Sequence, residues 1–450
     1  MTTSWTMTRR AALKTATAAA ALPLVHLRGA GAATTLKVGF WDHWVPGANA
    51  VIQKQVEDWG KKNNVAVALD FITSSGNKLL VTAAAEAQAG AGHDILQFGT
   101  WDPHNYADKL EPVDDVIKTL EAKAGAFNAV SQYLAKGKSG NWIAVPTTWG
   151  SQSKPSCARI SLLKNYTGLD VTQMYPPHET NGDAAQKWTW EGDFLKAAQA
   201  ASKNGTPFGL GLGQTSDSVD WVGALFTSYG AELVDKSGKP TVNSAAVNQV
   251  LEYAKTLVPY LPADAVSYDD ASNNRALISG KSALIFNPPS AWAVAKKDSP
   301  AVAADSWTFP SPAGPKGRFV PYLGFFWGIW KFSQQKAPAR ELIEYLLQRD
   351  VVQAREPVTQ GYDLPPQVSM QDFDIWSQVE PPKGTVYNYP LRPWHKAAFS
   401  IAAAPAPADI AVQIYNAGVM PTMLAKLKGG AGVKDAISWG QSQVEGFIQP

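Results

Sequence analysis

The sequence has a single cysteine among its 450 residues, which excludes a fold held together by internal disulfides. That residue, Cys157, is expected to be a small buried side chain. Charged residues are also few, at 17%, and the 40 basic and 38 acidic side chains nearly cancel. Binding to a nucleic-acid backbone relies on clustered Lys and Arg, so this balance does not indicate such a partner. Hydrophobic residues, at 45%, suffice for the cores of two or three domains.

The spacing of glycine and histidine excludes the common nucleotide and metal sites. Gly-Lys-Ser occurs at 137–139 and 280–282, but Gln132 and Arg275 stand where a phosphate-binding loop has its first glycine. The segment 209–213 lacks the Gly-x-Gly-x-x-Gly spacing of a dinucleotide site. The histidines never pair four residues apart or with a nearby cysteine, as zinc ligands do. We therefore expect neither a cofactor nor a metal.

The sequence does not favour an enzyme. The Gly-x-Ser-x-Gly turn that presents a nucleophilic serine is absent. Asp42 and Asp102 each follow a predicted strand and could act as the paired carboxylates of a glycosidase, but the sequence does not show that they face each other. We therefore expect a binding protein, with a glycoside-active envelope enzyme as an alternative.

The first 33 residues have the features of an export signal. A polar start with two arginines is followed by an Ala- and Leu-rich run over 11–27 and by small residues at 30–33 that suit a signal peptidase. The run TRRAALK at 8–14 resembles the twin-arginine motif of proteins exported in the folded state. The apolar run contains Lys14 and His26 and is too short for a membrane anchor. We therefore predict export to the periplasm by the twin-arginine route.

The rest of the chain alternates predicted strands and helices. Hydrophobic patterns predict strands at 36–41, 65–72, 93–98 and 142–145 and helices at 48–61 and 78–89. Three strand–helix units before residue 150 are typical of an α/β sheet. Beyond residue 147 the chain becomes rich in Trp, Pro and Gly, and helices are predicted again at 194–201, 245–258 and 340–347. The sequence therefore predicts an α/β protein whose second domain begins near residue 147.

Tryptophan is unusually frequent, with 17 residues, and it follows several predicted strands. The segments are 41–44 (Trp-Asp-His-Trp), 99–102 (Gly-Thr-Trp-Asp) and 147–149 (Thr-Thr-Trp). In an open α/β sheet, ligands bind beyond the carboxyl ends of the strands, so these segments would line one edge. An indole covers the apolar face of a pyranose while Asp and Thr bond its hydroxyls, which points to a neutral sugar or polyol. The alternative is that these indoles pack in the core or at a hinge.

Several segments resemble one family of binding proteins. Residues 188–205 (WTWEGDFLKAAQAASKNG) and 208–211 (FGLG) are similar to its Thr-Trp-Asp-Glu-Phe…Ala-Ala helix and Gly-rich strand. Residues 276–292 (ALISGKSALIFNPPSAW) resemble its Gly-Lys-Ala-Ala-Met…Gly-Pro-Trp passage, and 360–365 (QGYDLP) its Thr-Gly-Tyr-Leu-Pro. The chain is thus similar, over 34–450, to the extracellular solute-binding proteins of carbohydrate ABC transporters, the maltose-binding-like group of family 1.

The resemblance implies an α/β protein with the two-lobe periplasmic-binding-protein fold, type II-like, and a cleft between lobes joined by crossing hinge strands. It places 34–146 and 283–333 in the N-terminal lobe, and 147–282 and 334–450 in the C-terminal lobe. It further implies a monomer that captures a sugar, oligosaccharide or polyol by hinge closure. The partners would be this carbohydrate ligand and the permease subunits of an ABC importer.

By position, the resemblance also implies a set of ligand-binding residues: Trp41, Asp42, His43, Trp44, Trp101, Asp102, Trp149, Trp221, Asn287, Trp292, Trp327 and Tyr362. Two alternatives stay open for the ligand. An anionic compound such as a sugar phosphate or glycerol phosphate would use Arg159, Arg275 or Arg355, and a polyamine would need several acids in the cleft.

Overall fold

The structure, a computed structural model, describes residues 35–73, 75–174, 183–287, 289–379, 381–382, 385 and 397–448. The predicted export signal at 1–33 lies outside these ranges, so the export route stays a prediction. None of the helices in the described ranges has the length and apolar character of a membrane span.

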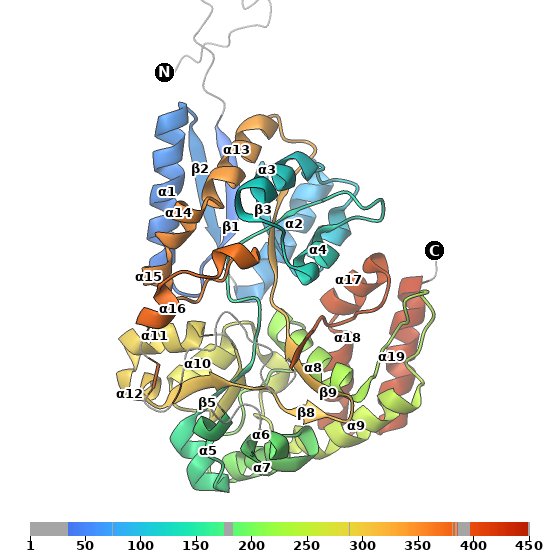
Figure 1. Cartoon of the computed structure of the whole chain (residues 1–450). Helices are drawn as coiled ribbons and strands as arrows, with labels where there is room; N and C mark the ends of the chain where they lie inside the picture. The colour runs from blue at the N-terminus through green and yellow to red at the C-terminus, as the bar shows by residue number, and fades with distance from the viewer. Residues whose placement is uncertain are drawn as a thin grey trace, which may run out of the picture. The chain divides into compact units, whose positions relative to one another are not determined.

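A mixed five-stranded sheet forms the core of the first lobe (Figure 1). Its order is β2–β1–β3–β10–β4; β1 pairs in parallel with β2 and β3, and β10 pairs antiparallel with β3 and β4. Because β1 and β3 are parallel, their carboxyl ends, Trp41 and Gly99, lie at the same edge of the sheet. The bounds are β1 (Leu36–Trp41), β2 (Val67–Ile72), β3 (Ile95–Gly99), β4 (Val145–Pro146) and β10 (Phe325–Ile329).

Helices from two distant parts of the chain pack on this sheet. The helix α1 lies against β2 and α13, and its buried Ile52, Val56 and Trp59 recur at helical spacing, which presents one apolar stripe. Asn64, in the left-handed conformation, ends α1. The bounds are α1 (Gly47–Asn63), α2 (Lys78–Ala89), α3 (Asp114–Ala124), α4 (Ala129–Ala135), α13 (Lys336–Leu346), α14 (Arg349–Gln353), α15 (Glu356–Thr359) and α16 (Ile375–Gln378).

The second lobe contains two three-stranded sheets. In one, β5 lies between β6 and β7 and pairs antiparallel with both. In the other, β9 pairs in parallel with β11 and antiparallel with β8. The bounds are β5 (Ser156–Arg159), β6 (Leu284–Phe286), β7 (Ser306–Phe309), β8 (Ala313–Gly314), β9 (Gly317–Pro321) and β11 (Ala398–Ser400).

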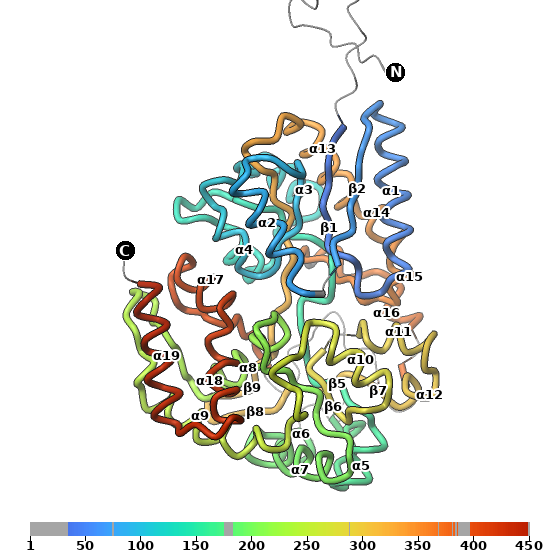
Figure 2. The backbone as a smooth tube through the Cα atoms, turned by 180° about the vertical axis from the view of Figure 1, so that it is seen from behind, coloured from blue at the N-terminus to red at the C-terminus, as the bar shows by residue number. Residues whose placement is uncertain are grey.

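The central helix of the second lobe is α8, which packs against β9, α9 and α18. Thr215 begins it, because its hydroxyl oxygen accepts the Ser218 N–H at 3.3 Å. Figure 2 shows α18 and α19 beside α9, and α17 packs against α18 and α19. The bounds are α5 (Ile160–Thr167), α6 (Asp183–Lys187), α7 (Leu195–Lys203), α8 (Ser216–Tyr229), α9 (Ala245–Leu257), α10 (Ser272–Ile278), α11 (Ser290–Asp298), α12 (Pro300–Ala303), α17 (Ala408–Asn416), α18 (Val419–Lys428) and α19 (Val433–Ile448).

The predicted α/β class is confirmed, and several predicted elements agree closely with the structure. The strand predicted at 36–41 and the helix predicted at 78–89 have those bounds. The strand predicted at 142–145 is shorter, because only Val145 and Pro146 pair with β10. Trp142 instead forms an isolated bridge with Lys136. Cys157 is fully buried on β5, as expected, and burial raises the pKa of its thiol to about 12.

The packing differs from the expected division into lobes in two places. The block 283–333 was expected in the N-terminal lobe as a whole, but β6 and β7 pair with β5, and only β10 joins the first sheet. The block 334–450 was expected in the C-terminal lobe, but α13 packs on β10 and α3, and α15 on α1. The physical reason is that the chain returns to the first sheet at 322–324 and stays there through α13 to α15.

Large aromatic side chains fill the space beside the crossing from the first lobe to the second, which runs through residues 147–155. Phe40 stacks on Trp327 with ring centroids 4.8 Å apart, and Trp149 meets Phe40 edge-on at 5.5 Å. All three are buried. This cluster fixes the start of the crossing against the first sheet.

Candidate ligand-binding site

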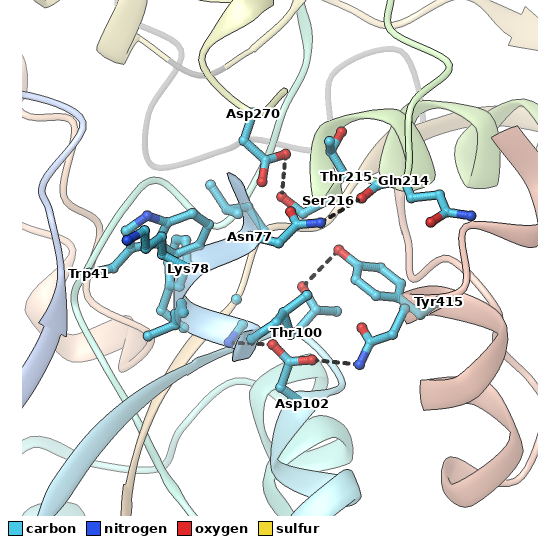
Figure 3. A pocket seen from close by; sticks show the side chains of 17 residues that line it. Trp41, Asn77, Lys78, Thr100, Asp102, Gln214, Thr215, Ser216, Asp270 and Tyr415 are labelled. Carbon is cyan, nitrogen blue, oxygen red and sulfur yellow. Dashed lines mark hydrogen bonds between the residues drawn. The ribbon is translucent and has the colours of Figure 1, made fainter. Parts of the chain in front are cut away.

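A cavity lies between the carboxyl ends of β1 and β3 and the beginning of α8 (Figure 3). The first lobe contributes the ends of these strands and the first turn of α2. The second lobe contributes the start of α8, the residue Asp270 before α10, and the end of α17. The lining includes Trp41, Asn77, Lys78, Leu79, Leu80, Thr100, Asp102, Gln214, Thr215, Ser216, Asp270, Leu323, Phe325, Tyr415 and Asn416.

A second, more polar cavity adjoins the first and shares part of its wall. The shared residues are Trp41, Ser216, Asp270, Leu323 and Phe325. The second cavity adds Trp44, Lys154, Asp217, Asn274, Asn287, Ser290 and Tyr362. Because the two cavities have these walls in common, we treat them as one candidate site, which we call the cleft site.

A buried lysine anchors a group of carboxylates at the cleft site. Lys154 is 3% exposed, and its Nζ lies 2.5 Å from Asp217 Oδ1 and 2.8 Å from Asp220 Oδ2. Burial alone would lower the pKa of Lys154, but the negative charges around it raise that pKa above its ordinary value. The ammonium therefore stays charged, and it holds the amino end of α8 close to the crossing.

Asp270 presents a carboxylate to both cavities. Its Oδ1 accepts a hydrogen bond from the Ser216 hydroxyl at 3.0 Å (Figure 3). The same oxygen accepts the Asp217 N–H, also at 3.0 Å. Among the described residues, Oδ2 has no hydrogen-bond partner. Burial raises the pKa of this carboxyl above its ordinary value, and the neighbouring Asp217 raises it further. Asp270 thus has one oxygen held by α8 and the other available to a ligand.

Asp102 links the end of β3 to α17. Its Oδ1 accepts from the Asn416 amide at 3.0 Å and its Oδ2 from the Gly99 N–H at 3.2 Å. Burial raises its pKa to about 6, and these two hydrogen bonds only partly offset that effect. Beside this pair, the Tyr415 hydroxyl donates to Asp220 Oδ1 at 2.8 Å. The hydrogen bond between Asp102 and Asn416 therefore joins the two lobes at one end of the first cavity.

The structure brings five of the predicted ligand-binding residues to the cleft site: Trp41, Trp44, Asp102, Asn287 and Tyr362. Trp41 lines both cavities and meets Trp44 with ring centroids 5.4 Å apart. The contribution of these residues to binding stays a prediction.

The other predicted residues do not line the cleft site. Asp42 accepts from the Asn49 amide, and His43 pairs with Asp363. The remaining five are buried. Trp101 donates to Ala402 O at 2.7 Å, and Trp221 donates to Gly211 O at 2.8 Å. Trp292 meets Trp307 edge-on at 4.9 Å, and Trp149 and Trp327 belong to the cluster with Phe40.

Sequence reasoning missed the polar residues of the second lobe. Lys154, Asp217 and Asp270 are separated by more than 50 residues from one another, and only the fold brings them together. One local signal was present, since Thr215 is a typical residue at the start of a helix, and such starts commonly face ligands. Within the described ranges, no group of three or more His, Cys, Asp or Glu side chains could hold a metal ion.

Comparison with known proteins identifies the family. Residues 45–353 match the model of the bacterial extracellular solute-binding protein family. The chain belongs to this family. Its members bind solutes and are not enzymes, in agreement with the expectation from the sequence. A curated relative, the "Probable ABC transporter-binding protein" of Deinococcus radiodurans, is 25% identical over 347 residues, which are 75% of this chain and 77% of the relative.

Solved structures confirm the fold. The maltose-bound MalE3 protein of T. maritima has a TM-score of 0.71 at 19% identity, covering 91% of this chain and 99% of that one. The sugar transporter of Arthrobacter chlorophenolicus A6 with bound laminaribiose has a TM-score of 0.73 at 16% identity, covering 92% of this chain and 100% of that one. The predicted two-lobe periplasmic-binding-protein fold is therefore confirmed.

Proposed function

We propose that the protein captures a neutral sugar, oligosaccharide or polyol in the periplasm and delivers it to an ABC importer. The observation that carries this proposal is the pairing of two unlike walls at the cleft site. The first lobe supplies apolar rings, with Trp41 and Phe325, and the second lobe supplies hydrogen-bonding groups at Ser216, Asp217 and Asp270. A pyranose offers an apolar C–H face and a rim of hydroxyls, which suits such a pair of walls.

The positions of the cationic side chains favour a neutral ligand over an anionic one. Of the arginines that could serve an anion, Arg159 and Arg275 each pair with an aspartate, and Arg355 is 1% exposed. None of the three lines the cleft site. Lys154 does line it, but two carboxylates already neutralise its charge. Among the described residues of the lining, Lys78 in the first cavity is the remaining cation.

The relatives support a saccharide and a transporter. The two similar structures named above contain maltose and laminaribiose, and the curated relative is named for an ABC transporter. The mechanism we propose is hinge closure of a monomer, in which ligand touches both walls only when the lobes are together. The closed form would then be recognised by the permease, and no bond of the ligand would be made or broken.

A ligand panel tests this proposal with the mature chain, residues 34–450. The panel contains glucose, maltose, laminaribiose and glycerol, together with glucose 6-phosphate, glycerol 3-phosphate and putrescine, measured by thermal shift and then by calorimetry. A ligand present at 100 times its Kd should stabilise the protein by about 2.7 kcal/mol. We expect stabilisation by at least one neutral compound and recovery of that compound unchanged by mass spectrometry.

Two outcomes would contradict the proposal. Stabilisation by the phosphorylated compounds or by putrescine alone would replace the neutral ligand with a charged one. Conversion of a saccharide during the incubation would make the protein an enzyme of the envelope.

A further inference from the structure

The crossing from the first lobe to the second is attached to a segment that follows α15, far away in the sequence. The Gly150 N–H donates to Asp363 Oδ1 at 2.8 Å, and the Leu364 N–H donates back to Gly150 O at 2.9 Å. Further along the crossing, the side-chain amide of Gln152 donates through Nε2 to Leu364 O at 2.6 Å. Residues 150–152 are therefore held to the first lobe by hydrogen bonds to both the backbone and a side chain.

The same carboxylate also holds the turn after β1. His43 Nδ1 accepts the Val45 N–H at 3.0 Å, which leaves Nε2–H to donate to Asp363 Oδ1 at 3.0 Å. His43 is 2% exposed and Asp363 1%, so solvent does not compete for these bonds. The His43 ring also lies 5.1 Å from the ring of Trp149, within the crossing. Asp363 thus connects the turn that carries Trp44 with the crossing.

The backbone of the crossing needs this support. Gln152 has a backbone φ of 59°, in the left-handed region that residues other than Gly, Asn and Asp seldom adopt. Such a conformation costs on the order of 1 kcal/mol or more and persists only where the surroundings impose it. Beyond this point the attachments change, because the Lys154 N–H donates to Pro321 O, where β9 ends. The attachment to the first lobe at residues 363–364 therefore stops at Gln152.

We propose that Asp363 is the positioning residue of the hinge: it fixes the crossing at Gly150 on the first lobe, so that closure bends the chain between residues 153 and 155 and between 321 and 323. The inference rests on the hinge closure of the proposed function, but it does not depend on which ligand is bound. It assigns a role to His43, which the sequence suggested as a ligand contact. In this role His43 affects ligand binding indirectly, because it holds the turn that carries Trp44.

Hydrogen exchange of the ligand-free mature protein tests the proposal without any ligand, so a failed sugar panel would not affect it. Asp363→Ala removes the acceptor of the Gly150 N–H, and exchange at the Gly150 and Leu364 amides should rise at least tenfold. Small-angle scattering should show a broader distribution of distances between the lobes. Asp363→Asn keeps one acceptor oxygen for Gly150, so its exchange should stay within about threefold of the wild type.

The matched control is Asp305→Ala in the second lobe. Asp305 has similar chemistry, because it accepts the Ser161 N–H at 2.8 Å and pairs with Arg159 at 2.9 Å. This variant should lower the denaturant midpoint and leave the amides of 150 and 364 and the scattering profile unchanged. If Asp363→Ala behaves like Asp305→Ala in all three measurements, the positioning role is overturned. If Asp363→Ala does not fold, His43→Gln takes its place: faster exchange at Gly150 supports the proposal, and wild-type exchange overturns it.

Discussion

The two walls of the cleft site differ in chemistry and in how they are held. The first-lobe wall is mostly apolar: the Trp41 ring meets the Phe325 ring edge-on at 5.0 Å, and Leu79 also lines the cavity. The second-lobe wall is mostly polar. An ion pair with Lys154 holds Asp217, and a hydrogen bond from the Asp217 N–H at the start of α8 holds Asp270. An apolar wall covers a ligand with little directional demand, whereas fixed hydrogen-bonding groups select its orientation.

The comparison shows what tryptophan contributes to this protein. Trp41 and Trp44 reach the cleft site from the first lobe, whereas Trp221 and Trp292, further along the chain, are 2% exposed in packed surroundings. These two tryptophans of the second lobe therefore do not line the cleft site, to which the second lobe adds the ring of Tyr415. We expect selection among ligands to depend on the carboxylates of Asp217 and Asp270.

The largest effect is expected from Trp292→Ala. Removing a buried indole that packs on Trp307 should lower the free energy of unfolding by about 3 to 5 kcal/mol, and affinity for the ligand found in the panel should stay near normal. Denaturant midpoints and calorimetric titration measure the two quantities. Trp41→Ala is the counterpart in the first-lobe wall and should mainly weaken binding. A strong loss of affinity in Trp292→Ala, with an unchanged midpoint, would place that residue in the site and end the contrast between the walls.

The next effect concerns pH and Asp102. Its pKa rises from 3.8 to about 6 on folding, so the folded state favours the protonated carboxyl. This contribution is fully present below about pH 4 and is lost as the pH rises through 6; two units correspond to roughly 3 kcal/mol. Asp102→Asn abolishes the titration, so between pH 4 and 7 its stability should fall less than that of the wild type. Urea midpoints at four pH values measure the difference.

The control for this pH dependence is Asp58→Asn, which removes an exposed carboxylate paired with Lys54 in α1. Its profile of stability against pH should follow that of the wild type over the same range. Parallel profiles for the wild type and Asp102→Asn would show that the contact with Asn416 keeps Asp102 charged, and the first cavity would then contain one more permanent negative charge.

The smallest effect is expected from Asp270→Asn. The change keeps the shape of the side chain and replaces one acceptor with a donor, so a ligand hydroxyl that donates to Oδ2 would lose its partner. A hydrogen bond to a charged group is worth about 1.5 kcal/mol or more, which corresponds to roughly a tenfold loss of affinity. The neighbouring Asp269, paired with Arg275, lies outside the cleft site and provides the control Asp269→Asn. Equal affinities in both variants would remove Asp270 from the set of ligand contacts.

The sequence predicted local features well and long-range ones only where a pattern marked them. The helix at 78–89 and the strand at 36–41 follow from hydrophobic periodicity and an ending glycine, which are local signals. Trp41 was found because it is the last residue of a strand whose end faces the cleft site. The pairing of β6 with β5 could not be predicted, because residues 156–158 and 284–286 meet only through the tertiary fold. The group around Lys154 was missed for the same reason.

The single thiol has a practical consequence. Cys157 lies fully buried on β5, and a thiol whose pKa is about 12 is almost entirely protonated at neutral pH. Maleimide and similar reagents, which need an accessible thiolate, should therefore leave the native protein unmodified. A cysteine introduced on the surface can then be labelled selectively without first replacing the natural one. With an environment-sensitive dye beside the cleft site, the protein becomes a fluorescent sensor for its own solute.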